Sequence, residues 1–166
     1  VPGVPAAWLN QNCYFGVHPC GARYGKDARS KIATITAMNC LFAEYDAKDF
    51  PGGKRAILAR LKRLPIFPSA VFDSGGGYHC YWFLRDTVTV NDGNRADMIA
   101  LQAAWVTLTG GDSASKDLAR VLRVPGTRNM KPEYGPDFPT VTLVQWTGAL
   151  YDLGVFATLT AGLVTV

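Results

Sequence analysis

Residues 40–50, Cys-Leu-Phe-Ala-Glu-Tyr-Asp-Ala-Lys-Asp-Phe, constrain the fold more than any other stretch of this chain. The first half is apolar and aromatic enough to form a buried β-strand, yet it carries Glu44 and Asp46. In a strand, this spacing places both carboxylates on one face. Two like charges side by side need a compensating cation, so the pattern favours a divalent metal with oxygen ligands. A strand end where both acids face water is the alternative.

The length and composition indicate one folded domain. The chain has 166 residues, of which 48% are apolar and 18% charged, and this is enough to bury a core. No apolar run approaches the ~20 residues that a membrane-spanning helix needs, so no membrane partner is expected. The chain begins at Val1 rather than Met. We therefore expect residues 1–166 to be a single domain excised from a longer protein.

The charge pattern is weakly informative. The net charge of +4 has the sign expected for a polyanion partner, but charge alone decides nothing. Residues 21–31 form a basic stretch that predicts a solvated loop, and a loop beside a nucleic acid or a triphosphate is the alternative.

The cysteines indicate reduced thiols in a cytoplasmic setting. Cys40 and Cys80 lie inside strand-like runs and are expected to be buried. Cys13, His18 and Cys20 are candidate zinc ligands, but the chain has no Cys-x-x-Cys pair and no evident fourth ligand, so a zinc site is disfavoured.

Hydrophobic periodicity predicts alternating strands and helices. The predicted strands are residues 13–17, 32–46, 70–72, 78–84 and 140–146. One helix is predicted at 54–64, with Asp49 as its cap and Pro51 in its first turn. A second helix is predicted from a cap at Asn91 or Asp92 to Leu108, and a short third helix after residue 151. These elements predict an α+β fold with a mixed or antiparallel sheet and flanking helices.

A glycine turn with the sequence Ser-Gly-Gly-Gly-Tyr-His occupies residues 74–79. Glycines let backbone N–H groups approach an anion closely, and Ser74 and His79 can donate hydrogen bonds to phosphate oxygens. A purely structural hairpin turn also explains the glycines. The histidine directly after them favours the phosphate site, because the chain has only two histidines.

Residues 112–129 combine two acids, Asp112 and Asp117, with three arginines, two of which are Arg120 and Arg123. The interleaved leucines and valines must be buried, so the arginines need anionic partners. Those partners are either the two aspartates themselves or a bound triphosphate, which suits the guanidinium fork.

In their order and spacing, these three stretches resemble the catalytic core of the archaeo-eukaryotic primase superfamily, in particular the primase–polymerase (PrimPol) domains of phage and plasmid replication proteins. The resemblance rests on the acid-x-acid strand, the small-residue turn that ends in His79, and the acid followed by Arg-x-x-Arg and Val-Pro-Gly-Thr. It covers about residues 14–131. The family often has Asp at the first acid, where this chain has Glu44.

The resemblance implies a primase–polymerase catalytic core with an RRM-like half, which performs template-directed nucleotidyl transfer as a DNA primase or DNA polymerase. Two divalent cations, Mg²⁺ or Mn²⁺, are implied, with Glu44, Asp46 and Asp112 as both metal ligands and catalytic residues. Asp117 stays open as an alternative third ligand. The implied nucleotide-binding residues are Ser74, Gly77, His79, Arg120, Arg123 and Lys131.

The implied partners are a single-stranded DNA template, nucleoside triphosphates and a fused or associated helicase, in the cytoplasm of a prokaryotic host and encoded by a phage or plasmid. Other functions stay open: a repair polymerase of the ligase-associated type, a nuclease, or a catalytically idle module that binds single-stranded DNA or a replication origin. A rolling-circle initiator is disfavoured because it needs a paired-histidine metal motif, and the chain has only His18 and His79.

Overall fold

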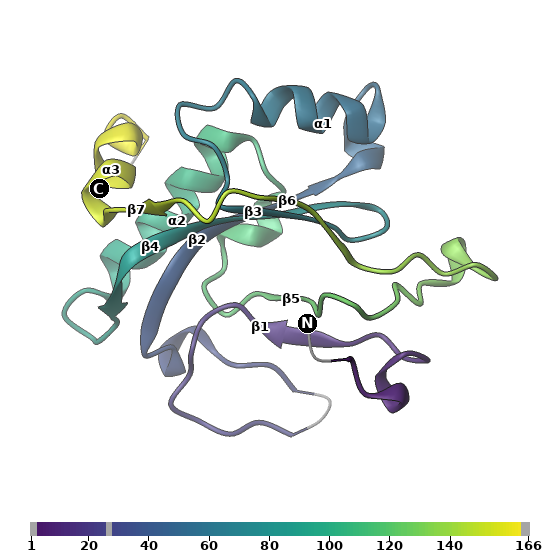
Figure 1. Cartoon of the computed structure of the whole chain (residues 1–166). Coiled ribbons are helices and arrows are strands. Elements are labelled where there is room, and N and C mark those ends of the chain that lie inside the picture. The colour runs from purple at the N-terminus through teal and green to yellow at the C-terminus, as the bar shows by residue number, and fades with distance from the viewer. Residues whose placement is uncertain (1–2, 26–27, 164–166) are drawn as a thin grey trace.

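The fold is organised around a five-stranded sheet, shown in Figure 1. The computed structural model describes residues 3–25 and 28–163. In spatial order the sheet contains β2 (Ala37–Asp46), β4 (Gly77–Thr89), β3 (Ala70–Asp73) and β6 (Thr142–Trp146), and β7 (Leu150–Tyr151) pairs with β4. The β4–β7 pairing is parallel and the others are antiparallel.

A separate two-stranded ribbon consists of β1 (Tyr14–Gly16) and β5 (Val121–Arg123). The described α-helices are α1 (Gly53–Leu61), α2 (Arg95–Thr109) and α3 (Leu153–Thr160). This arrangement confirms the predicted α+β class with a mixed, mainly antiparallel sheet and flanking helices.

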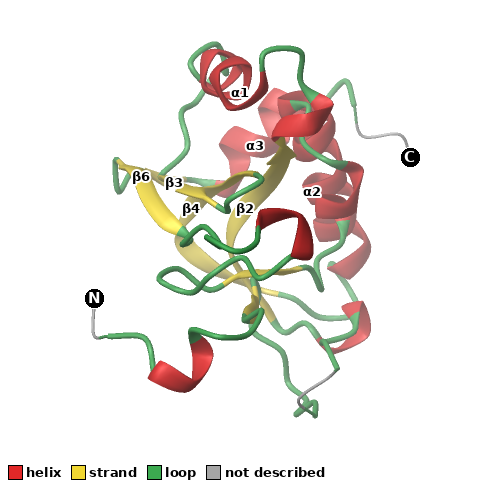
Figure 2. Ribbon diagram, turned by 90° about the vertical axis from the view of Figure 1, so that its right-hand side faces the viewer, coloured by secondary structure: helices red, strands yellow, loops and turns green. Residues whose placement is uncertain are grey.

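The two faces of the sheet are covered differently, as Figure 2 shows. Leu41 and Tyr45 of β2 point toward the helices and belong to the larger core cluster. Cys40 and Phe42 point to the opposite face and form a second cluster with Leu122 of the ribbon. The alternation of a strand therefore sends neighbouring residues of β2 into two separate cores.

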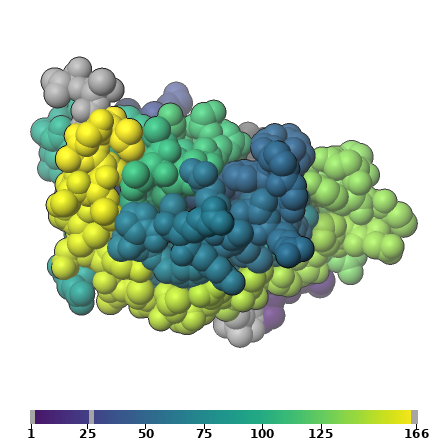
Figure 3. All heavy atoms as spheres, turned by 90° about the horizontal axis from the view of Figure 1, so that it is seen from above, coloured from purple at the N-terminus to yellow at the C-terminus, as the bar shows by residue number. Residues whose placement is uncertain are grey.

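Seen from above in Figure 3, α1 covers the middle of the molecule and α3 lies at one end. The segment around residue 135 projects at the other end. Among the described residues, no helix has both the length and the apolar character needed to cross a membrane.

The strand predicted over residues 32–46 begins later, at Ala37. Ile32–Thr34 forms a 3-10 turn instead. The Thr34 hydroxyl donates to the carbonyl of Lys31 at 2.9 Å, and the Thr34 backbone N–H donates to the same carbonyl. These local hydrogen bonds compete with strand pairing, so the chain turns before β2 begins.

The prediction that α1 begins at Asp49 and Pro51 was wrong. Asp49 ends a short 3-10 turn, and α1 begins at Gly53 with Gly52 at its N-cap. Gly52 and Gly53 have φ angles of 96° and 59°, a region that glycine enters readily. The chain therefore turns at these two glycines before the helix starts. The helix also ends at Leu61 rather than at residue 64.

The predicted cap of α2 was also wrong, because its N-cap is Asn94 rather than Asn91 or Asp92. The Asn94 side chain accepts a hydrogen bond from the Asn91 N–H at 2.9 Å. At the other end, Gly110 has a left-handed φ of 71° and stops the helix, as the glycine pair predicted.

The predicted hairpin is confirmed, with β3 and β4 joined by the glycine turn. The Ser74 N–H donates to the Gly77 carbonyl at 2.9 Å, and Gly75 has a φ of 94°. Gly77 lies opposite Asp46 of β2, and a β-carbon there would run into the carbonyl of Tyr45. Gly77 thus lets β4 approach β2 closely.

All four cysteines are free thiols, and Cys40 and Cys80 are buried as predicted. Within residues 3–25 and 28–163, no group of three or more His, Cys, Asp or Glu residues is placed to hold a metal ion.

Candidate active site

A cleft of about 290 Å³ opens beside the face of the sheet that carries the ribbon. Its lining comes from β2, β4, the glycine turn, the ribbon and the segment after it. The lining residues are Tyr14, Glu44, Asp46, Ser74, Gly76, His79, Asp112, Arg120, Val121, Leu122, Arg123, Asn129, Lys131 and Tyr134. Of the predicted site residues, all but Gly77 line this cleft. Gly77 is placed instead where two strands pair.

The carboxylates reach the cleft from two places in the chain. Glu44 and Asp46 lie on β2, on the face predicted from their spacing. Asp112 follows α2, and its backbone N–H donates to the Glu44 carbonyl at 2.8 Å. A β-carbon at Gly111 would lie 2.9 Å from the Ala43 β-carbon and 3.1 Å from the Glu44 carbonyl oxygen. Glycine there allows the loop that carries Asp112 to pack against β2.

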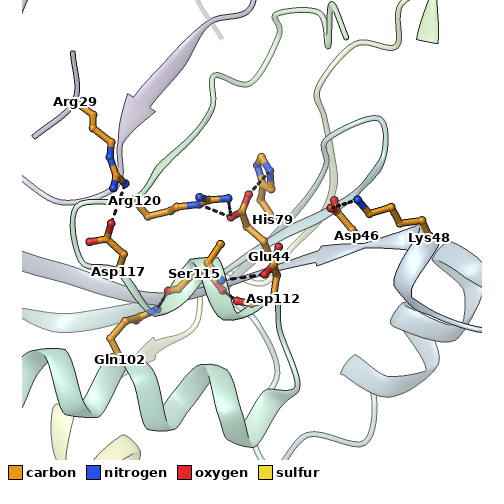
Figure 4. Close-up of polar contacts among 11 residues, drawn as sticks. Arg29, Glu44, Asp46, Lys48, His79, Gln102, Asp112, Ser115, Asp117 and Arg120 are labelled. Atoms are coloured by element: carbon orange, nitrogen blue, oxygen red, sulfur yellow. Dashed lines mark hydrogen bonds and ion pairs between the residues drawn. The ribbon is translucent and has the colours of Figure 1, made fainter. Parts of the chain in front are cut away.

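Glu44 is more enclosed than Asp46, with 15% of its side chain exposed against 39% for Asp46. Arg120 contacts its Oε2 through both Nε and Nη2 at 2.5 Å, as Figure 4 shows. The pKa of Glu44 is raised overall, mainly by burial and further by the neighbouring Asp112 and Asp46 carboxylates. The Arg120 guanidinium opposes this shift. Arg120 is therefore the counter-ion of Glu44 in this structure.

His79 lies directly across the sheet from Glu44, and its Nε2 is 3.5 Å from Glu44 Oε1. Burial lowers the pKa of His79 to about 3, and the neighbouring Arg123 and Arg120 contribute to the same shift. The imidazole is therefore neutral near pH 7. Its buried Nδ1 has no hydrogen-bond partner among the described residues, which leaves one ring nitrogen available to a ligand.

Of the two aspartates considered as the third acid, Asp112 lines the cleft and Asp117 does not. The Asp112 carboxylate accepts a hydrogen bond from the Ala114 N–H at 2.9 Å. Asp117 is directed to Arg29, with Oδ2 2.8 Å from Nη1, as Figure 4 shows. The geometry thus brings Asp112, the preferred candidate, together with the acids of β2.

The opposite side of the cleft is basic. Arg123 is 5% exposed and donates from Nη1 to Asn12 Oδ1 at 2.6 Å. Its guanidinium lies over the Tyr14 ring, 4.8 Å from the centroid. Lys131 is more exposed, with its Nζ 3.9 Å from Glu133. Together with Arg120, these two basic residues give the cleft three cationic groups beside its carboxylates.

Sequence reasoning missed several residues of the cleft, namely Tyr14, Gly76, Asn129 and Tyr134. The Asn129 amide donates to the Ser74 carbonyl at 2.8 Å and connects the segment after the ribbon to the glycine turn. A β-carbon at Gly76 would collide with the Tyr134 hydroxyl group. Gly76 belongs to the glycine turn and Asn129 ends the 112–129 stretch, but the sequence offers no reason to single out either residue, because both reach the cleft through contacts between distant parts of the chain.

The donor set has the chemistry of a divalent-cation site, since three carboxylates line one cleft and carboxylate oxygens suit Mg²⁺ and Mn²⁺. In their present positions these acids do not form a cluster of three metal-binding groups among the described residues. Glu44 is engaged by Arg120, and Asp112 by the Ala114 N–H. Metal binding would thus require these side chains to turn from their present partners.

A family model and two solved structures that are similar to this chain all describe primase or primase-polymerase domains. Residues 53–151 match the family model of the RepB DNA-primase N-terminal domain. The structure is similar to the AEP domain of the cyanophage S-2L primase-polymerase (PrimPol), with a TM-score of 0.68 and 28% identity, over 96% of this chain and 78% of that chain. It shares the fold of the catalytic domain of primase RepB′, solved in complex with initiator DNA, with a TM-score of 0.51 and 18% identity, over 84% of this chain and 61% of that chain.

A curated relative, Uncharacterized protein MJECL28 of Methanocaldococcus jannaschii, is 27% identical over 145 residues. The match covers 81% of this chain and 10% of that protein. The chain thus spans about a tenth of the length of this relative.

Proposed function

Since this chain belongs to the RepB DNA-primase N-terminal domain family, which implies DNA primase activity, we propose that it transfers nucleotidyl groups from nucleoside triphosphates to a growing strand on a DNA template. The reaction releases pyrophosphate. The proposal covers both starting a strand, as a primase does, and extending one, as a polymerase does.

One observation carries this proposal: three carboxylates and a set of phosphate-binding groups line the same cleft. Template-directed nucleotidyl transfer needs both, because the acids hold cations and the basic side binds the triphosphate. A nuclease has less use for the basic side, since hydrolysis of a phosphodiester involves no triphosphate. The pairing of the two sides therefore favours a polymerase.

Glu44, Asp46 and Asp112 are the residues that would hold two divalent cations. When bound, such ions activate the attacking 3′-hydroxyl and stabilise the leaving pyrophosphate. Asp46 is more accessible than Glu44, with 39% of its side chain exposed and Lys48 Nζ 3.7 Å away. Its loose pairing leaves it open to a cation.

The phosphate-binding side consists of groups that differ in charge. Arg123 is held in place by Asn12 and Tyr14 and presents a fixed positive charge to the triphosphate. His79 is neutral and donates one N–H, and the Ser74 hydroxyl is positioned by the glycine turn. Arg120 retains donors beyond those that contact Glu44, so it can bind a phosphate oxygen as well. Most of the catalytic effect then comes from positioning and charge neutralisation.

The proposed partners are a single-stranded DNA template and a helicase that is fused to this domain or associated with it. Binding of initiator DNA by the RepB′ catalytic domain supports the first. The far greater length of the archaeal relative fits the second. A phage or plasmid origin in a prokaryotic host is part of the same proposal.

Unprimed synthesis on single-stranded circular DNA tests the proposal, with ribo- and deoxyribonucleotides supplied separately in Mg²⁺ or Mn²⁺. Asp112→Asn should abolish product, whereas Asp117→Asn, the matched control outside the cleft, should retain it. Equal loss in both variants, or full activity of Asp112→Asn, would remove Asp112 from the site. Product on primed but not on unprimed template would assign the repair-type extension activity instead.

A titration of labelled nucleoside triphosphate with and without Mn²⁺ separates the polymerase from an idle DNA-binding module. Nucleotide binding that depends on Mn²⁺ supports the proposal. Binding of single-stranded DNA with no binding of nucleotide, in the presence or absence of Mn²⁺, would overturn it.

A further inference from the structure

A hollow of about 760 Å³ adjoins the cleft and takes no part in the chemistry proposed above. Tyr14 and Val121 of the ribbon line both spaces, so the hollow and the cleft share a border. The cleft alone has a volume of about 290 Å³, just below the roughly 300–1,000 Å³ of typical ligand pockets. A cleft of this size suits phosphates and cations, and the rest of a nucleotide needs adjoining space.

The hollow contains polar groups without partners. His18 lines it and is 3% exposed, and neither ring nitrogen has a hydrogen-bond partner among the described residues. The buried hydroxyl of Ser30, which also lines the hollow, has none either. Buried polar groups are costly to leave unpaired, and most are satisfied by protein, water or a ligand. His18 and Ser30 thus bring unpaired polar atoms to the wall of the hollow, and a bound molecule would supply their partners once these buried atoms turn toward it.

The free groups are uncharged. Burial lowers the pKa of His18 to about 4, so its imidazole is neutral near pH 7. Arg29 also lines the hollow and retains further donors, but the Asp117 carboxylate 2.8 Å from its Nη1 neutralises its charge. A neutral imidazole and a hydroxyl each offer a donor and an acceptor. This combination suits the edge of a nucleobase or the hydroxyls of a sugar better than it suits a phosphate.

Tyr14 stands at the border between the two spaces. One face of its ring lies against the Arg123 guanidinium, and 48% of the residue is exposed. An exposed aromatic face in a nucleic-acid enzyme is suited to stacking with a base, and such stacking does not depend on which base it is. The Tyr14 ring therefore separates a phosphate-binding guanidinium from a space with uncharged hydrogen-bonding groups.

We propose that the hollow binds the nucleoside part of a nucleotide whose phosphates lie in the cleft, with its base stacked on Tyr14. This inference rests on the proposed function and names a substrate contact at the same site. The nucleotide has two possible sources, a free nucleoside triphosphate or the terminal nucleotide of a DNA strand. Both present the same base and sugar, and the experiment below distinguishes them.

Comparing a nucleoside triphosphate with inorganic tripolyphosphate, which has no base or sugar, isolates the contribution of the hollow. Both ligands are titrated in Mg²⁺ into wild type, Tyr14→Leu and Tyr14→Phe. We expect Tyr14→Leu to weaken nucleoside triphosphate binding about 10-fold, within the range for loss of one base–aromatic stack. Tyr14→Phe should retain wild-type affinity, and tripolyphosphate should bind all three proteins within about 2-fold, because no stack is involved.

Filling the hollow provides a second, independent variant. A β-carbon at Gly16 would lie 3.7 Å from the His18 carbonyl oxygen and 3.9 Å from Ser30 Oγ, ordinary contact distances. Gly16→Leu should therefore occupy the hollow and weaken nucleotide binding, with tripolyphosphate binding unchanged. Gly154→Leu in α3 is the matched control, since a β-carbon there meets nothing within 4 Å. Thermal unfolding of both variants establishes that they are folded.

The same variants are titrated with a labelled single-stranded oligonucleotide. Weaker binding of the free nucleotide assigns the hollow to the incoming substrate, and weaker binding of the oligonucleotide alone assigns it to the strand terminus. If Tyr14→Leu weakens tripolyphosphate as much as the nucleotide, Tyr14 acts only through Arg123 and the inference fails. It also fails if neither Tyr14→Leu nor Gly16→Leu weakens nucleotide or oligonucleotide binding. A wild-type protein that binds neither nucleotide nor tripolyphosphate would instead refute the proposed function itself.

Discussion

The two walls of the cleft differ in how firmly they are built. The wall that carries Glu44 and Asp46 belongs to β2, a strand of ten residues paired with the 13-residue β4 and packed on the helices. The opposite wall is a ribbon whose two strands have three residues each. All three residues of β1 are exposed. Figure 1 shows this ribbon apart from the five-stranded sheet.

We infer from this difference that the wall formed by β2 is more rigid than the wall formed by the ribbon. Regions with few buried contacts open at lower free energy than a packed sheet. Glu44 and Asp46 therefore belong to the stable part of the molecule, whereas the exposed strand β1 with Tyr14 belongs to the part that opens more readily. A metal site benefits from fixed ligands, and a wall that binds a nucleotide benefits from freedom to admit and release it.

The largest expected effect tests the chemistry of the sheet wall. Glu44→Gln and Asp46→Asn should each lower the rate of nucleotide addition about 10³-fold, because each removes a charge that holds the cations of the transition state. A primer-extension assay measures the rate, and thermal unfolding measures stability. Full activity in both variants would contradict the assignment of these acids.

The next effect tests the close approach of β4 to β2 in the wall that carries Glu44 and Asp46. Gly77→Ala should lower the free energy of unfolding by about 3 kcal/mol, because the new methyl group meets the Tyr45 carbonyl and forces β4 away from β2. Urea denaturation measures the change. Gly154→Ala is the control, because a β-carbon at that position in α3 meets open space and should change stability by less than about 1 kcal/mol. Equal stability of the two variants would show that the strands do not need this close approach.

A smaller effect is expected on the ribbon wall. Arg123→Met should weaken nucleoside triphosphate binding by about 10-fold to 100-fold, the range for loss of a hydrogen bond to a charged group. His79→Ala should weaken it in the same direction, because its imidazole faces the same space. Arg85→Met is the matched control, since Arg85 pairs with Asp152 outside the cleft. Nucleotide affinity that is unchanged in Arg123→Met would remove Arg123 from the site.

The smallest expected effect concerns His18 and the stability of the folded protein at acidic pH. Burial lowers the pKa of folded His18 to about 4, below its ordinary value of about 6.5. Between about pH 6.5 and pH 4, His18 therefore binds a proton in the unfolded chain but not in the folded protein. The folded state loses stability as the pH falls through this range, and the loss ends once His18 is protonated in the folded protein too. From pH 7 to pH 5, His18 should account for a loss of about 1 to 2 kcal/mol.

His18→Leu should reduce this loss, as measured by urea denaturation at the two pH values. His79 remains in the variant, and its pKa of about 3 in the folded state causes a second loss in the same direction. An identical loss in wild type and His18→Leu would show that His18 is protonated as easily in the folded state as in the unfolded chain.

The parts that could be predicted are those that depend on neighbouring residues. The alternation of β2 placed Glu44 and Asp46 on one face, and the glycine turn predicted the β3–β4 hairpin. The predicted starts of β2 and α1 were less accurate, because local hydrogen bonds at Thr34 and a left-handed backbone at Gly52 turn the chain before each element begins. Such competing local structures do not change the periodicity of the sequence, so periodicity alone does not reveal them.

By itself, the sequence determined the α+β class, the pair of acids on one strand and the three motifs on which the family resemblance rests. Only the tertiary structure decided which of Asp112 and Asp117 reaches the cleft, because the packing of Gly111 on β2 directs one inward and Arg29 holds the other away. It also brought Asn12 to Arg123, 111 residues away along the chain. Local patterns report the geometry of one element, whereas a cleft depends on how distant elements pack together.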